Sequence, residues 1–339
     1  MTDIEKQRYA GNARQADLFA TEPDNAPAAR APGNSNKKAQ AFVWPMARDD
    51  EERVVEKLQE TGRYRIQRQL TPRPIVQNHV VVPGQSIGII LDTETTGLDH
   101  RKDEIIELGM VAFTYDASGV RDVIGVFSQL REPAVPISAE ITNITGITMD
   151  MVAGRSIDPD EISAFIAGAE LVIAHNAKFD RPFCEAFHDG FSHKAWACSV
   201  AEVDWTSLGF EGNKLVYLIG QCGFFHNGHR AVDDCHALLE VLTSSTGVSA
   251  ESAFLQLEAS AGKDRLHVFA QNSPFDTKDI LKARGYRWND GSDGRAKSWW
   301  TEIDETAYEA ELKFLRQEIY RSEAEPIVRR LSAYDRYRA

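Results

Sequence analysis

The sequence has few cysteines, no long apolar run and no excess of positive charge. Only four cysteines occur in 339 residues, which argues against a secreted domain stabilised by disulfide bonds. No apolar stretch approaches the roughly 20 residues that cross a bilayer, and no secretory signal is recognisable. The formal net charge of -13 argues against a protein that binds nucleic acid electrostatically along its whole length. These absences predict a cytoplasmic protein with no membrane partner.

The chain is long enough for several domains, and 42% of its residues are hydrophobic, which is ample for a core. Composition and periodicity predict a helix over 49–62 and a strand over 64–70. The whole chain divides into five parts: a disordered tail over 1–50, a helix-strand extension over 51–85, a main domain over 86–248, a small aromatic and basic module over 262–303, and a C-terminal helix over 304–339.

The main domain opens with an acidic pair after a buried strand. Ser86–Leu91 is an apolar run of strand length, and Asp92 and Glu94 follow it. Residues two apart on an extended backbone point to the same face. Two carboxylates on one face repel each other unless cations lie between them, although an ordinary acidic turn is the alternative. The segment ends with hydroxyls and a glycine that suit a bound nucleotide: Thr95, Thr96 and Gly97.

A second segment brings a third acid. Asp158 and Pro159 predict the start of a helix that runs to about residue 168. Leu171–Ala174 then predicts a buried strand, and the helix after it carries Asp180. We expect this helix to present Asp180 toward the strand-borne pair.

A third segment contains His229 and Asp234, which are five residues apart. On one continuous helix their side chains would lie about 140° apart, so we expect His229 on a loop and Asp234 on the following helix. Asp233 competes for the role but would point about 100° away. A loop histidine is a natural general base. The four acids and the histidine predict a phosphodiesterase site with two divalent cations.

Together the three segments resemble the DEDDh 3′→5′ exonucleases, the DnaQ-like group that includes the proofreading subunit of bacterial replicative polymerase. The resemblance covers about residues 86–246. It implies a ribonuclease-H-like α/β fold, with a mixed five-stranded sheet flanked by helices. It also implies that His229 is the base and that Thr95 and Thr96 hold the terminal nucleotide. The implied ligands of two Mg²⁺ or Mn²⁺ ions are Asp92, Glu94, Asp180 and Asp234.

The resemblance implies release of nucleoside monophosphates from DNA 3′ ends, with single strands as substrate, in proofreading or repair. No polymerase motif is present, so a DNA polymerase partner would act in trans. Trimming of RNA is an alternative, and an adaptor with a vestigial nuclease site is another. The sequence departs from many members at Thr145, where they carry a histidine that approaches the substrate.

A zinc site is a weaker interpretation of the third segment. Cys222, His226, His229 and Cys235 lie close in sequence, and both residue types bind zinc. Their spacing fits no common zinc-finger pattern. Core cysteines beside a catalytic loop explain the same residues.

The N-terminal tail contains a segment similar to the pentapeptide with which bacterial polymerases and repair proteins bind the sliding clamp. Leu18 and Phe19 would fill an apolar pocket, and Gln15 would anchor the segment by hydrogen bonds. A chance apolar segment in a tail is the alternative. A sliding clamp is therefore a second predicted partner of the chain.

The C-terminal module has a strand over 266–270, a helix over 277–283 and a hairpin near 286–300 in this interpretation. Residues 263–297 contain eight Lys or Arg and five Asp, an excess of basic residues in an acidic chain. Arg287, Trp288 and Trp299 would suit stacking on single-stranded bases. The alternative is that the tryptophans form the core of a small domain.

Overall fold

The structure is a computed structural model that describes residues 48–244, 252–292 and 294–338. Nearly all of the tail expected over 1–50 lies outside the described residues, and so does the clamp-like segment with Gln15, Leu18 and Phe19. The chain divides into two units, residues 1–60 and 61–339. In the first unit, the expected helix is present as α2 (Arg48–Glu60). None of the helices in these ranges is long and apolar enough to cross a membrane.

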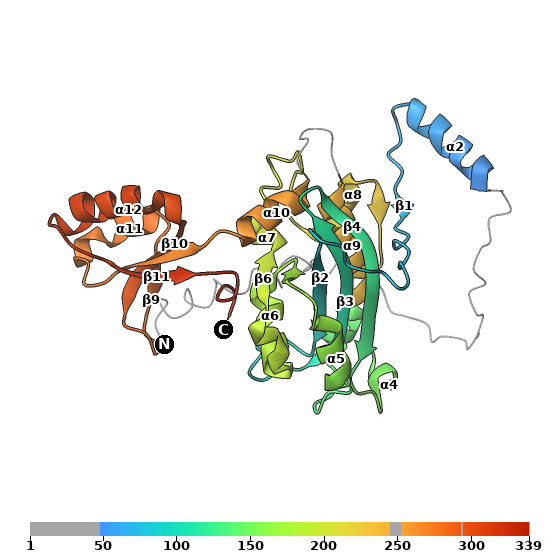
Figure 1. The fold of residues 1–339 in the computed structure, drawn as a ribbon, viewed down its shortest axis with the longest axis horizontal. Helices are drawn as coiled ribbons and strands as arrows, with labels where there is room; N and C mark the ends of the chain where they lie inside the picture. Colours follow the sequence, from blue (N-terminus) through green and yellow to red (C-terminus); the bar gives the residue numbers. More distant parts are fainter. Residues whose placement is uncertain (1–47, 245–251, 293, 339) are drawn as a thin grey trace, which may run out of the picture. The chain divides into compact units, whose positions relative to one another are not determined.

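The second unit is built on a mixed five-stranded sheet with the order β4-β3-β2-β5-β6 (Figure 1). The two longest pairings, β2 with β3 and β3 with β4, are antiparallel, whereas β2 with β5 and β5 with β6 are parallel. This ribonuclease-H-like arrangement is the α/β fold expected from the sequence. The strands are β2 (Ser86–Thr95), β3 (Ile105–Asp116), β4 (Gly119–Leu130), β5 (Leu171–Ala174) and β6 (Ala195–Cys198).

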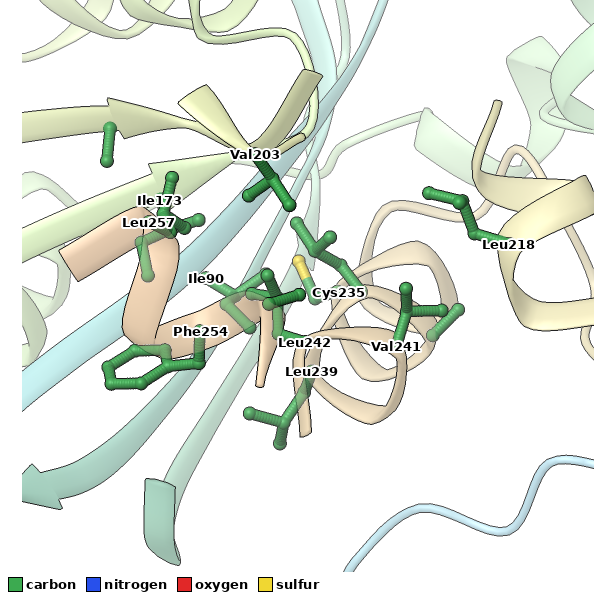
Figure 2. Close-up of a cluster of buried hydrophobic side chains, with 14 of the residues drawn as sticks. Ile90, Ile173, Val203, Leu218, Cys235, Leu239, Val241, Leu242, Phe254 and Leu257 are labelled. Carbon is green, nitrogen blue, oxygen red and sulfur yellow. The ribbon is translucent and has the colours of Figure 1, made fainter. Parts of the chain in front are cut away.

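Helices cover both faces of this sheet because its strands are apolar on both sides. On the face that carries Ile90, the strands pack against Leu239 and Phe254 of two helices, as the side chains in Figure 2 show. On the other face, Ile89 packs in a core with Phe183. The helices around the sheet are α3 (Ala139–Thr145), α4 (Met149–Val152), α5 (Pro159–Ile166), α6 (Ala177–Phe187), α7 (Ser199–Glu202), α8 (Leu215–Gln221), α9 (Ala231–Thr243) and α10 (Ala253–Ala261), with a 3-10 turn η3 (Asp189–His193).

Several local predictions are confirmed in this unit. Asp158 caps α5 by accepting a hydrogen bond from the Asp160 amide at 2.9 Å, and Pro159 begins the helix. The strand expected over 171–174 is β5, and the helix after it is α6 with Asp180. The predicted strand over 64–70 is wrong in extent, because only β1 (Arg68–Gln69) pairs, with the equally short β7 (Phe224–Phe225).

The start of α9 packs directly on β3 at Gly109. A Cβ atom at Gly109 would lie 2.5 Å from the Ala231 carbonyl carbon and from the Val232 amide nitrogen. Because both atoms belong to the backbone, no side-chain rotation could relieve the contact. Gly109 pairs with Asp92 across β2 and β3, so this approach places the start of α9 beside the acidic end of β2.

We expect Gly109→Ala to lower the free energy of unfolding by about 1–3 kcal/mol, as overpacking does. It should also reduce nuclease activity, because α9 carries Asp234 and would shift away from Asp92. Urea denaturation and a nuclease assay measure the two effects. Gly262→Ala is the matched control, since a Cβ at Gly262 would meet its nearest atom at 3.6 Å. Equal stability of the two variants would contradict the proposed packing constraint.

The C-terminal module is a four-stranded antiparallel sheet with the order β11-β8-β10-β9. Its core contains Val268, Leu281, Tyr286, Leu315 and Ile319, so the helices pack on one side of the sheet (Figure 1). The elements are β8 (Arg265–Ala270), η4 (Phe275–Thr277), α11 (Lys278–Ala283), β9 (Arg287–Asn289), β10 (Ser298–Asp304), η5 (Glu305–Ala307), α12 (Tyr308–Phe314), the π-helix η6 (Leu315–Tyr320) and β11 (Ile327–Leu331).

One expectation for this region is wrong. Residues 304–339 do not form only a C-terminal helix, because the helix ends at Tyr320 and β11 then adds a strand to the module sheet. The periodic apolar residues of the helix hid the short strand, which has few apolar positions. Of the three residues predicted to contact nucleic acid, Arg287 lies opposite Trp300, whereas Trp288 lies opposite Trp299, so Arg287 lies on the other face of the sheet from the two tryptophans.

After β11, residues 332–338 return to the nuclease sheet; we call them the C-terminal anchor. The Ala333 carbonyl accepts a hydrogen bond from the amide of Trp196 on the edge strand β6 at 2.9 Å. Arg336, which is buried, contacts Glu202 at 2.6 Å, and the Tyr337 hydroxyl donates to the same carboxylate at 2.7 Å. The module is therefore joined to the nuclease sheet at both of its ends.

Candidate active site

Three of the four predicted acids converge at the end of β2. Asp92, Glu94 and Asp234 each offer a carboxylate oxygen, and these three atoms lie within 4.8 Å of one another. Asp92 and Glu94 point to the face of β2 that α9 covers, and Asp234 projects from the first turn of α9. A strand and a helix far apart in the sequence thus build one acidic cluster.

Asp180 approaches this cluster from α6, on the other side of β2. Its Oδ1 accepts hydrogen bonds from the Thr93 amide at 3.2 Å and the Thr93 hydroxyl at 2.9 Å. Thr93 lies between Asp92 and Glu94 in sequence and points to the opposite face. The Asp180 charge nevertheless acts on Asp92, whose pKa it helps to raise. Thr93 therefore holds the fourth acid next to the other three.

The carboxylates repel one another and are poorly solvated. Burial, followed by the charges of Asp180 and Asp234, raises the pKa of Asp92 well above its ordinary value. Burial, followed by the charge of Asp234, raises the pKa of Glu94 to about 8. Burial also raises the pKa of Asp180 to about 7, against the opposing hydrogen bonds from Thr93. Such a cluster is the environment that a divalent cation stabilises.

The sequence interpretation missed a buried ion pair beside the acids. Glu107 on β3 lies opposite Glu94 and is almost fully buried. Its carboxylate accepts hydrogen bonds from the Arg230 guanidinium at 2.8–3.3 Å and from the Ala231 amide at 3.1 Å. This pair fixes the residue before α9 to the sheet. The signal in the sequence was a single glutamate inside the apolar run 105–113.

The predicted base lies on a loop, as expected, but its imidazole is exposed. His229 has a positive φ of 63°, and its backbone amide donates to Asp234 Oδ2 at 2.8 Å. A different histidine, His226, contacts Asp234: its Nε2 lies 2.6 Å from Oδ1. Both oxygens of Asp234 therefore have partners in the loop before α9.

The residues expected at the nucleotide make contacts within the protein. The Thr95 hydroxyl donates to the Gly97 carbonyl at 2.6 Å, and the Thr96 hydroxyl accepts from the Glu104 amide at 2.9 Å. A Cβ at Gly97 would lie 2.5 Å from the carboxylate of Asp103, so a larger residue there would have to displace that side chain. The three residues lie at the end of β2 and directly after it.

Thr145 is buried at the end of α3. Many DEDDh exonucleases carry a histidine at this position. The hydroxyl of Thr145 donates to the Ile141 carbonyl at 2.9 Å and accepts from the Ile147 amide at 3.0 Å. The Thr145 hydroxyl thus satisfies backbone groups at the helix end and is not directed toward a substrate.

The donor set suits a hard divalent cation better than zinc. Three carboxylates with ligand oxygens this close match the oxygen coordination of Mg²⁺ or Mn²⁺. In the part of the chain that the structure describes, these acids are the one group of His, Cys, Asp or Glu side chains close enough to share an ion. Cys235 instead is buried and contacts the Gly109 carbonyl at 3.4 Å, which agrees with a core role.

We expect the metal-free protein to lose stability as the pH rises from about 4.5 to about 8. Glu94 and Asp180 ionise near 8 and 7 in the folded state, against ordinary values of 4.5 and 3.8. Between these limits the folded state keeps protons that the unfolded state releases, so ionisation favours unfolding. Melting temperatures in EDTA should therefore fall toward pH 8, and added Mg²⁺ should raise them most at that pH.

Glu94→Gln should flatten this pH dependence, because the amide cannot ionise. Asp150→Asn, at an exposed carboxylate of α4, serves as the control and should leave the slope unchanged. An increase of the metal-free melting temperature between pH 5 and 8 would be incompatible with the raised pKa values.

Comparison with known proteins agrees with this geometry. The RNase_T family model, described as an exonuclease, matches residues 89–242. The DNA polymerase III subunit epsilon of Treponema pallidum is 36% identical over 163 residues, which cover 45% of this chain and 73% of that protein. The PolC-type DNA polymerase III of Thermotoga maritima is 29% identical over 175 residues, covering 47% of this chain but only 12% of the relative.

Two solved structures of exonucleases are partly similar to this chain. Exonuclease X in complex with 5′ overhanging duplex DNA is 24% identical, with a TM-score of 0.39, covering 51% of this chain and 99% of that one. Exonuclease I of E. coli in complex with an oligonucleotide is 15% identical, with a TM-score of 0.42, covering 65% and 63%. By its family model and its Treponema pallidum relative, the chain belongs to the DnaQ-like family of 3′→5′ exonucleases.

Proposed function

We propose that this enzyme removes nucleoside monophosphates from the 3′ end of single-stranded DNA, in replication proofreading or repair. The observation that carries the proposal is the cluster of Asp92, Glu94 and Asp234, whose ligand oxygens lie within 4.8 Å of one another. DNA is favoured over RNA because the sequence relatives are named as DNA polymerase III proteins. A DNA polymerase that acts in trans is the corresponding partner.

The four acids would hold two Mg²⁺ or Mn²⁺ ions, which when bound neutralise the phosphoryl charge and acidify a water molecule. Asp92 lies near both Asp180 and Asp234, whose charges act on its pKa, so it would help to hold both ions. Asp180 is oriented by Thr93, and Glu94 is backed by the Glu107–Arg230 pair. These supporting contacts limit the movement of the acids as a phosphate enters.

His229 is the proposed general base. It would accept the proton of the attacking water once the loop turns its exposed imidazole toward the acids. A Cβ atom added at the preceding Gly228 would meet only His226 Nε2, at 3.9 Å, so the space beside this glycine is open. His226 would then release Asp234 Oδ1, which becomes available to a cation.

The test is digestion of 5′-labelled single-stranded DNA and RNA of one sequence, with Mg²⁺ or Mn²⁺. The proposal predicts a ladder that shortens from the 3′ end of the DNA. His229→Ala should slow it about 10²- to 10⁴-fold, the usual contribution of a general base. His193→Ala, at an exposed histidine of η3, is the matched control and should keep full activity.

Three outcomes would overturn parts of this proposal separately. A ladder on RNA alone would assign the enzyme to RNA turnover. Loss of activity in His226→Ala with full activity in His229→Ala would move the role of base to His226. Absence of a ladder on both substrates would contradict a catalytic site and favour an adaptor with a vestigial nuclease domain.

A further inference from the structure

Among the residues that the structure describes, the helices of the C-terminal module pack on only one face of its sheet. Leu266, Val268 and Ala270 of β8 point into the core with α11 and η6, so the alternate residues of β8 point to the other side. We call this other side the open face. One row of residues crosses all four strands on it, as the strand registers show: Arg287, Trp300, Phe269 and Ile327.

The open face combines flat rings with positive charge. The Arg287 Cζ lies 5.4 Å from the centroid of the Trp300 ring, and the His267 ring lies 4.8 Å from it. In the next row, Arg329 of β11 pairs with His267. Ile327 at one end of the first row is 54% exposed. A base entering this face would meet the Trp300 ring and the Arg287 guanidinium that lies over it.

Charge on the open face favours a polyanion. Among the described residues, Arg287 and Arg329 have no carboxylate within ion-pair distance, whereas Glu302 on the same face is bound to His267 at 2.9 Å. In a chain with a net charge of -13, two arginines without a described ion-pair partner thus lie on the face that carries Trp300.

We propose that the open face binds single-stranded DNA by stacking bases on Trp300 while Arg287 and Arg329 contact phosphates. This inference rests on the proposed function, because the strand is the continuation of the substrate whose 3′ end enters the nuclease site. It also changes the sequence-based assignment: Arg287 stays a contact, but Trp300 replaces Trp288 and Trp299.

The attachment of the module to the nuclease explains why such a face would help catalysis. The module follows α10, whose Phe254 and Leu257 lie in the nuclease core, and the C-terminal anchor returns to β6. A strand held on the module therefore stays at high local concentration around the nuclease site. The acidic nuclease domain itself offers little long-range attraction to DNA.

The experiment measures binding of a 5′-fluorescein oligothymidylate of about 30 nucleotides by anisotropy, with full-length protein in EDTA. All variants carry Asp92→Asn, which prevents digestion. Trp300→Leu keeps the apolar volume but removes the ring, and it should raise Kd about 5- to 100-fold. Trp300→Phe restores a ring and should restore most of the affinity, which separates stacking from a folding defect.

The matched control uses a second aromatic and cation pair on another surface. Lys278 Nζ lies 4.3 Å from the ring centroid of Phe275, which is 81% exposed in η4 before α11. The Phe275→Ala/Lys278→Ala double variant should bind as the parent does. Arg287→Ala with Arg329→Ala should lower the slope of log K against log salt by about 0.7 for each arginine.

Each result has one interpretation. Unchanged affinity in Trp300→Leu overturns the proposal, even if the enzyme digests DNA normally. Reduced affinity in Trp300→Leu, together with a wild-type protein that digests no DNA, supports the binding face and refutes the proposed nuclease function. Equal loss in the Phe275/Lys278 control would also overturn it, because binding would then not be specific to the open face.

Discussion

Asp92→Ala is expected to reduce nuclease activity by at least about a thousandfold, which corresponds to about 4 kcal/mol of transition-state stabilisation. Four neighbouring acids act on Asp92: Asp180, Asp234, Glu94 and Glu107 all raise its pKa. In the proposed arrangement, a carboxylate at the centre of such a cluster would contact both cations. Removing it should therefore disrupt both cation positions at once.

The same substitution should leave the metal-free protein as stable as the wild type or more stable. The carboxylate of Asp92 is repelled by those of Glu94 and Asp180. Its removal therefore ends this repulsion and should stabilise the folded state. A relief of 1 kcal/mol would raise the melting temperature by about 2–4 °C in a domain of this size. Asp92→Asn removes the charge without leaving a cavity, and it should show the increase more clearly than alanine.

Thermal unfolding in EDTA and a nuclease assay in Mg²⁺ measure both effects on one preparation. Asp150→Ala, on α4, is the control and should change neither quantity. Adding Mg²⁺ should raise the melting temperature of the wild type more than that of Asp92→Ala. A large fall in melting temperature with retained nuclease activity would show that Asp92 is structural and not a ligand.

Local patterns were sufficient to predict the elements that carry the acids. The apolar run before Asp92, the cap at Asp158 and the apolar residues 171–174 are each signals within a few residues. They place Asp92 and Glu94 on one face of β2 and Asp180 on α6, as the structure has them. The resemblance of the three segments to one family then predicted the sheet that brings them together.

The supporting contacts could not be predicted because each depends on a distant partner. Glu107 and Arg230 are 123 residues apart, and nothing near either one specifies the other. Gly109 looks like any glycine in a strand until the backbone of α9 is placed against it. On the module, β9 is three residues long, and only its pairing with β10 shows which tryptophan shares a face with Arg287. These features follow from the fold and not from local sequence.

The C-terminal anchor is a further feature of this kind, and it bears on Asp180 through the next residue. Arg181 is fully buried, and its guanidinium donates to the carbonyls of Arg336 at 2.6 Å, Tyr334 at 2.7 Å and Ala333 at 3.3 Å. Its Nε also donates to Glu185 at 2.7 Å. A buried arginine with this many acceptors connects α6 to the end of the chain.

We expect Arg181→Met to lower the free energy of unfolding by about 3–5 kcal/mol, because it leaves Glu185 and the anchor carbonyls without their donor. Arg121→Met is the matched control: Arg121 also bonds a carboxylate, Asp116, at 2.7 Å, but on the surface. A surface pair contributes only about 0–1 kcal/mol. Arg181→Lys keeps the positive charge but loses the planar guanidinium with its several donors, so it should recover only part of the free energy of unfolding.

A reduced stability alone would not show that the anchor positions the active site, so the decisive measurement is the Mg²⁺ dependence of activity. At a temperature where Arg181→Met remains folded, a displaced α6 should move Asp180 away from Thr93 and raise the Mg²⁺ concentration needed for half-maximal rate. Arg121→Met should leave that concentration unchanged. Deleting residues 332–339 should reproduce the Arg181→Met shift, since it removes the same acceptors from the other side. If both variants lose stability but keep the wild-type Mg²⁺ dependence, the anchor holds the fold together without acting on Asp180.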